Sequence, residues 1–130
     1  MHRREQGQSL VEFVLSLAVL VIIVLGLFDL GRAFNAYLVI TNAAREGAYY
    51  AGMHPCDELG NVNPLIVSHV IQEAQGSGIT LAAANVTVSS SCVSGTPIRV
   101  SVYYDFSLFS FVLPGIRTIR LRNFAEMVIY

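Results

Sequence analysis

The sequence has little charge and no lysine. Only 13% of its 130 residues are charged, and its eight arginines stand against nine acidic residues, for a formal net charge of −1. A protein that binds nucleic acid carries a clear basic excess, so no nucleic-acid partner is expected. The hydrophobic content of 54% is too high for a disordered chain. The length allows one small domain, or a half-domain with a tail.

The common catalytic motifs are also missing. The sequence contains no G-x-x-x-x-G-K-[ST], H-E-x-x-H, C-x-x-C or G-x-S-x-G segment. The loop Met53–Glu58 mixes possible metal ligands, but no second cluster accompanies them. We therefore expect no enzyme activity, no catalytic residue, no metal site and no cofactor.

Charge is absent altogether from Phe13 to Phe28, which reads FVLSLAVLVIIVLGLF. Extended back to Leu10, this run approaches the roughly 20 residues that span a bilayer. Arg3 and Arg4 precede it, which predicts a cytoplasmic N-terminus and an extracytoplasmic remainder. A cleaved secretory signal would need an A-x-A-like site after the run, and the sequence has none there. The run therefore predicts a single-pass membrane protein.

Glu12 is the one acid at the head of the apolar run. A carboxylate costs roughly 2.5–3.5 kcal/mol near the centre of a membrane and less near its surface, so such residues usually have a partner. If the chain is cut between Gly7 and Gln8, the new α-amine of Gln8 lies one helical turn away. It could neutralise Glu12 in the same subunit or in a neighbouring one, and so set the axial position of the helix.

The helical pattern continues beyond the apolar run. No proline precedes Pro55, and apolar residues recur in steps of three and four. One helix is predicted over residues 8–52, with a membrane half at about 10–28 and an outer half at about 29–52. Its length would be roughly 65–70 Å. The apolar positions of the outer half are Leu30, Ala33, Phe34, Tyr37, Leu38, Thr41, Ala44 and Ala48.

Several features of this helix leave two interpretations open. Asp29 and Arg32 lie three residues apart, so they form either a solvated ion pair at the membrane edge or a contact between packed subunits. The segment 45–47 (Arg-Glu-Gly) is ambiguous in the same way. A patch of small residues either lets neighbouring helices approach closely or supports the C-terminal domain, and both can hold. It comprises Ala43, Ala44, Gly47, Ala48, Ala51 and Gly52.

The remainder, 53–130, reads as a small extracytoplasmic α+β domain. A loop leads to Asn63-Pro64, an N-cap followed by proline at the first helical position, and this short helix ends at Gly76. Alternation predicts strands at 86–92, 98–106 and 117–130, the last with a bulge near Asn123. The predicted fold is α+β. The long helix and one short helix cover an antiparallel sheet of three to four strands.

Other residues of this domain receive modest roles. His69 is predicted on the helix surface or in packing, and the cluster Arg117, Arg120 and Arg122 on a solvated face. The segment 108–113 (LFSFVL) is unusually apolar for a connection. It packs on a neighbour, lies near the membrane or extends a strand.

The two cysteines, Cys56 and Cys92, are predicted to pair. Disulfides are favoured outside the cytoplasm, and this bridge would contribute roughly 4 kcal/mol in the entropic account. Two free buried thiols are the alternative.

Gly7, Glu12 and Phe13 form a G-x-x-x-x-E-F segment before the apolar helix. With this segment, about the first fifty residues resemble the TadE-like family of the tight-adherence (Tad/Flp, type IV) pilus, which implies a pilin-like fold. The resemblance further implies a prepilin leader at 1–7, processing between Gly7 and Gln8, and assembly through Glu12 and Phe13. The further positions that match the family's segments are Asp29, Gly31, Arg32, Asn42, Arg45, Glu46 and Gly47.

The resemblance also implies a function. The chain would be a pilin or pseudopilin, cut by prepilin peptidase and assembled with identical or related subunits into a helix bundle that supports surface adhesion. Its other partners would be the inner-membrane assembly machinery and, before assembly, membrane lipid. Two alternatives remain open: an unprocessed single-pass membrane protein with an extracytoplasmic partner-binding domain, and a periplasmic enzyme accessory.

Overall fold

The computed structural model describes residues 2–89, 92–109, 115 and 117–130, with the side chains of residues 2–6 left out. The predicted α+β class is confirmed: a long helix, a second helix and a three-stranded antiparallel sheet follow one another along the chain. The elements are α1 (His2–Met53), α2 (Leu65–Gly76), the 3-10 turn η1 (Ala83–Asn85), β1 (Val86–Val88), β2 (Pro97–Ser107) and β3 (Thr118–Val128).

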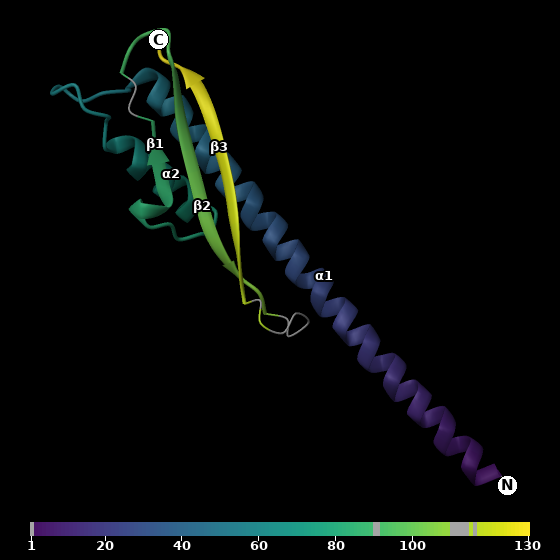
Figure 1. The fold of residues 1–130 in the computed structure, drawn as a ribbon. Helices are drawn as coiled ribbons and strands as arrows, with labels where there is room; N and C mark the ends of the chain where they lie inside the picture. The colour runs from purple at the N-terminus through teal and green to yellow at the C-terminus, as the bar shows by residue number, and fades with distance from the viewer. Residues whose placement is uncertain (1, 90–91, 110–114, 116) are drawn as a thin grey trace.

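Helix α1 dominates the shape of the molecule. Its 52 residues extend about 78 Å at 1.5 Å per residue, and Figure 1 shows the other elements gathered along its C-terminal half. The helix begins at His2 rather than at the expected Gln8, and it ends at Met53, one residue beyond the expected end. Gly7 therefore lies inside a continuous helix. The helix tolerates it, because a single interior glycine lowers helix stability by only about 1 kcal/mol.

The sheet is ordered β1-β2-β3. Strand β2 alternates as predicted: Val100 and Val102 are fully buried, while Arg99 and Asp105 are exposed. Strand β1 is shorter than the expected 86–92, and residues 90–91 lie outside the described part of the chain. The central strand thus presents one apolar face to the helices and one polar face to solvent.

The predicted bulge near Asn123 is wrong. The register between β2 and β3 runs unbroken from Pro97↔Val128 to Ser107↔Thr118, with Asn123 opposite Val102. The Asn123 side chain is half-buried and donates from Nδ2 to Thr41 Oγ1 at 2.6 Å. A polar side chain that finds a partner on the covering helix can face inward, so the ladder has no reason to break.

The core lies between the outer half of α1, the sheet and α2. Helix α1 packs on β2 and β3, and α2 packs on α1 and β1. The small residues of α1 from Ala43 to Gly52 are buried beneath the chain's own domain. They therefore support this domain and are not open to a neighbouring helix. The buried apolar residues are Ala36, Val39, Ile40, Ala43, Ala44, Ala48, Ala51, Ile66, Val70, Ala74, Ile79, Leu81, Val86, Ile98, Val100, Val102, Phe106 and Ile129.

The apolar segment 108–113 follows β2. The amide of Leu108 donates to the carbonyl of Arg117 at 2.9 Å, which continues the pairing of β2 with β3. Leu108 packs partly on the core, and Phe109 is 73% exposed. Residues 110–113 of this segment lie outside the described residues.

Candidate functional site

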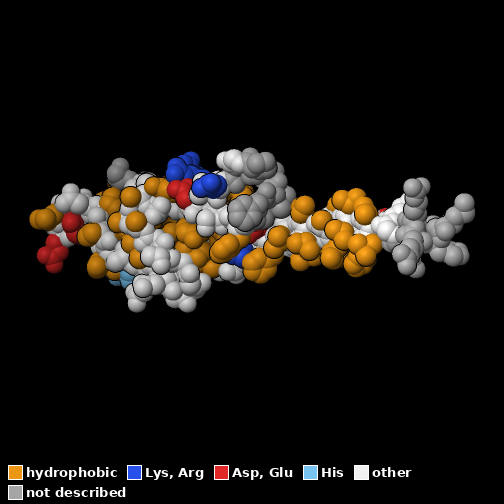
Figure 2. All heavy atoms as spheres, turned by 90° about the horizontal axis from the view of Figure 1, so that it is seen from below, with side chains coloured by type: hydrophobic (Ala, Val, Ile, Leu, Met, Phe, Trp, Pro, Cys, Tyr) orange, Lys and Arg blue, Asp and Glu red, His pale blue; other side chains and the backbone are white. Residues whose placement is uncertain are grey.

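Within the described part of the chain, the apolar N-terminal half of α1 is not covered by the outer domain. None of its most apolar 18-residue stretch is buried, and Figure 2 shows hydrophobic side chains along the visible face of a narrow stem. The helix is long and apolar enough to cross a membrane, as judged by length and composition. The chain is therefore compatible with a single-pass membrane protein. A rod of this kind can pack only against lipid or against other protein chains.

The predicted processing and assembly residues lie at the start of this rod. Gly7 and Gln8 are exposed within the continuous helix, and a Cβ at Gly7 would meet no atom within 4 Å. Glu12 is exposed and, within the described part of the chain, its carboxylate forms no hydrogen bond or ion pair. Phe13 is 66% exposed. Contacts among the described residues therefore explain neither Gly7 nor Glu12.

Asp29 marks the point where α1 meets the domain. It is only 3% exposed, and its Oδ1 accepts hydrogen bonds from Arg32 Nη1 at 3.1 Å and from the Phe109 amide at 3.2 Å. Asp29 and Arg32 do form an ion pair. The interpretation of this pair as solvated is wrong for Asp29, because its carboxylate is buried. The carboxylate instead ties α1 to the end of β2, 80 residues away in sequence.

Two phenylalanine rings accompany this ion pair. The Arg32 guanidinium carbon lies 5.0 Å from the centre of the Phe106 ring and 4.4 Å from that of Phe109. Arginine over an aromatic face is an attractive arrangement. Sequence reasoning did not assign either ring to this site, although the unusual apolarity of the segment that contains Phe109 was a usable signal.

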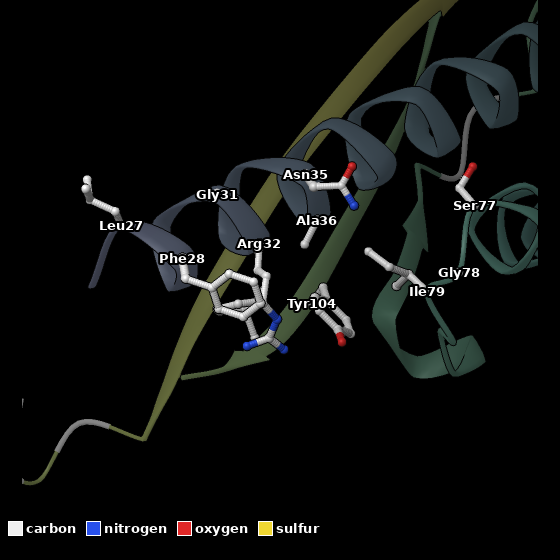
Figure 3. Close-up of a pocket in the computed structure, with 11 residues that line it drawn as sticks. Leu27, Phe28, Gly31, Arg32, Asn35, Ala36, Ser77, Gly78, Ile79 and Tyr104 are labelled. Carbon is white, nitrogen blue, oxygen red and sulfur yellow. The ribbon is translucent and has the colours of Figure 1, made fainter. Parts of the chain in front are cut away.

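An open hollow of about 630 Å³ adjoins this junction. Helix α1 forms one wall, the loop after α2 another, and the end of β2 the third (Figure 3). Among the described residues, Arg32 is the only charged one that lines the hollow. Its lining residues are Leu27, Phe28, Gly31, Arg32, Asn35, Ala36, Ser77, Gly78, Ile79, Tyr104 and Phe106.

The remaining motif positions separate into two groups. Gly31 faces open space, and Asn42, Arg45 and Glu46 are exposed; within the described residues the last three form no side-chain hydrogen bond or ion pair. Gly47 is buried so close to α2 that an added Cβ would clash with Val70. Gly47 thus has a packing role inside the chain, whereas the exposed residues face outward.

The predicted disulfide is present. Cys56 and Cys92 are bonded, with their Cα atoms 5.8 Å apart. The bridge joins the loop after α1 to the segment between β1 and β2. The covalent loop that it closes therefore contains α2 and β1.

The remaining candidate residues of the outer domain are used in packing and turns. Asp57 Oδ1 accepts from the amides of Leu59 and Asn61, at 3.0 and 2.8 Å. His69 stacks on Tyr50 with ring centres 3.9 Å apart. Across the part of the chain that is described, no group of three or more histidine, cysteine or acidic side chains could hold a metal ion.

One member of the predicted arginine cluster, Arg120 in β3, forms an ion pair with Asp105 in β2. Arg120 donates to Asp105 from Nε at 2.7 Å and from Nη2 at 3.0 Å. The hydrogen bonds from Arg120 lower the pKa of the exposed Asp105 carboxyl, and the same bonds raise the pKa of Arg120. Arg120 and Asp105 thus pair across β3 and β2 on the solvated face of the sheet.

Taken together, these features define an α+β protein built on one long helix, whose free half is suited to a membrane and whose outer half carries a small domain. The family described as TadE-like protein matches residues 7–48. The resemblance expected from the sequence is thus confirmed over these residues, and the TadE-like family is a structural, pilus-associated family. The match includes the apolar rod, the Asp29 junction and Gly47, and it ends before the outer domain. No curated protein and no solved structure matches the chain.

Proposed function

We propose that this protein is a subunit or pseudopilin of a tight-adherence pilus, held in the membrane by α1 and then assembled through that helix to support adhesion. The observation that carries the proposal is the free half of α1, which belongs to the matched region and has no partner in its own domain. Prepilin peptidase would cut between Gly7 and Gln8 on the cytoplasmic side. The outer domain would be extracytoplasmic and, after assembly, part of an extracellular filament.

The outer half of α1 supports assembly over a plain anchor. Leu30, Phe34 and Leu38 are 66%, 62% and 44% exposed. Their spacing of four places them on one face of the helix, and this stripe continues the apolar surface of the rod beyond the membrane. A plain anchor has no use for such a stripe, whereas a helix that packs beside copies of itself or related subunits buries it.

Glu12 would set the register between the assembled helices. Its carboxylate is exposed on the rod and lies one turn from Gln8, whose α-amine processing would create. In an ion pair between these groups, the Glu12 carboxylate would not be an uncompensated charge inside an apolar bundle. Inner-membrane assembly proteins would then act on the processed chain.

Processing is tested with two glycines of the same helix. A Cβ atom at Gly7 or at Gly26 would meet no atom within 4 Å. Leucine at either position should therefore leave the fold intact. We expect Gly7→Leu to leave an intact Met1 and Gly26→Leu to begin at Gln8, as read by N-terminal sequencing of membrane-extracted protein. An intact Met1 in the unsubstituted chain, in cells with active peptidase, would refute processing and favour the unprocessed anchor.

Assembly is tested at Glu12. Glu12→Gln keeps the size and helix propensity of the side chain but removes its charge. We expect normal membrane levels and normal processing, with at least a tenfold loss of sheared filaments. Glu73→Gln, which changes an exposed acid on α2 outside the matched region, is the matched control. Normal filament yield from Glu12→Gln would refute the register role.

A further inference from the structure

The end of β2 lies beside α1 where the apolar run stops. The Phe109 amide is bonded to Asp29, and the Phe109 ring stacks on Arg32. Asp29 is the first charged residue after Glu12. Phe109 is therefore held at the height of the first turn beyond the apolar run, and Figure 1 shows the β2–β3 end of the sheet beside the middle of α1.

The dimensions place this turn in the headgroup layer. Residues 10–28 rise about 28 Å, close to the hydrocarbon thickness of about 30 Å. With Phe28 at the hydrocarbon boundary, the step from Asp29 to Arg32 rises only about 4.5 Å more. The headgroup region adds about 5–7 Å on each side of the hydrocarbon, so Phe109 falls within it.

The chemistry of the junction suits that layer. Phe109 is 73% exposed and Phe28 is 61% exposed, and phenylalanine is among the apolar side chains that insert at the boundary between headgroups and acyl chains. The Arg32 guanidinium is held between the Asp29 carboxylate and the rings of Phe106 and Phe109, so its charge is compensated at this height. The buried Asp29 carboxylate accepts hydrogen bonds from Arg32 and from the Phe109 amide, so it is not left bare at the boundary.

We infer that the end of β2 makes a second contact with the phospholipid surface, with the Phe109 ring inserted among the headgroups beside the membrane-spanning helix. This inference rests on the proposed membrane span of α1. Two contacts, one through the helix and one through Phe109, restrain the tilt and rotation of the subunit in the membrane. The domain then presents the apolar stripe of α1 in a fixed direction before assembly.

Single tryptophans can test this contact, because the natural sequence contains none. Phe109→Trp is compared with Leu20→Trp in the middle of the rod and with Tyr130→Trp at the far end of the domain. Tyr130 is 83% exposed, and its amide bonds to Gly52, about 35 Å along α1 from Asp29. Each full-length chain is reconstituted in phosphatidylcholine–phosphatidylglycerol vesicles whose acyl chains carry bromine either near the headgroup or deep in the bilayer.

We expect bromine near the headgroup to quench Phe109→Trp at least twofold and deep bromine to quench it less. Leu20→Trp should show the opposite order, and Tyr130→Trp should respond to neither. Aqueous iodide should quench Tyr130→Trp more than Phe109→Trp. Circular dichroism and the intact disulfide serve as the check that each variant is folded.

Three results would overturn the inference, and they differ from one another. Phe109→Trp that is unquenched by bromine and open to iodide, with Leu20→Trp quenched, removes the lipid contact and leaves the membrane span standing. Phe109→Trp that is shielded from iodide but unquenched by bromine indicates a protein contact instead. Leu20→Trp that is unquenched by any lipid removes the span itself, and with it the proposed function.

Discussion

Replacing Gly47 by alanine would insert a methyl group where α1 crosses α2. The new Cβ would lie far inside the van der Waals contact distance of Val70 Cγ2 and 3.4 Å from Val100 Cγ1. Both valines are fully buried, and a β-branched side chain has little rotational freedom. The helices and sheet must therefore move apart to accommodate the methyl group.

The expected size of this effect comes from two opposing terms. Overpacking a well-filled core costs about 1–3 kcal/mol, and replacing an interior helical glycine by alanine gains about 1 kcal/mol. Gly31 lies on the same helix but faces open space, so Gly31→Ala receives only the gain. Gly47→Ala should therefore be about 1–3 kcal/mol less stable than Gly31→Ala.

A second substitution makes the test specific. Val70→Ala removes the methyl group that the new Cβ would strike, so Gly47→Ala should be much better tolerated in that background. The two substitutions should show a favourable coupling of about 1–3 kcal/mol in a double-mutant cycle.

The measurement is urea unfolding of the full chain in lipid nanodiscs, followed by tyrosine fluorescence. Equal stability of Gly47→Ala and Gly31→Ala would refute the close approach of α1 to α2. A coupling near zero with Val70→Ala would show that a different contact causes the destabilisation.

Two further predictions concern the outer domain. Cys56→Ala with Cys92→Ala should lower its unfolding free energy by about 4 kcal/mol in the loop-entropy account, measured by the same unfolding; a loss below 1 kcal/mol would contradict it. Because Arg120 lowers the pKa of Asp105, the pair stabilises the fold above the ordinary aspartate pKa of about 3.9 and loses this contribution as the pH falls through the lower folded value. Carboxyl NMR should show the pKa of Asp105 rising in Arg120→Gln, and an unchanged value would exclude the pairing.

Much of the fold could be predicted from local pattern. The absence of proline before Pro55 and the apolar spacing from Leu30 onward define one long helix, since both act through neighbouring turns. The alternation of Ile98, Val100 and Val102 likewise defines a half-buried strand. The start of α1 at His2 was missed, because a processing motif is a feature of chemistry and carries no signal for where a helix begins.

The candidate site could be predicted only in part. Glu12 and Gly7 stand out because a charge and a glycine interrupt an apolar pattern, and that contrast is visible in the sequence. Asp29 and Arg32 could be paired from their spacing, but their burial could not. Their further partners are Phe106 in β2 and Phe109 just after it. Phe109 is 80 residues from Asp29 in sequence, and no local rule connects them.

Local sequence pattern was enough to predict an apolar helix, an acid at its head and a small half-buried sheet, because hydrophobic periodicity is a property of adjacent residues. The surfaces of that helix that remain free are set by tertiary packing. This packing buried the small-residue patch under the domain, turned Asn123 toward Thr41 and fixed Phe109 against Asp29. These outcomes depend on long-range packing and hydrogen bonding, in which each polar group finds a partner that the chain brings from far away.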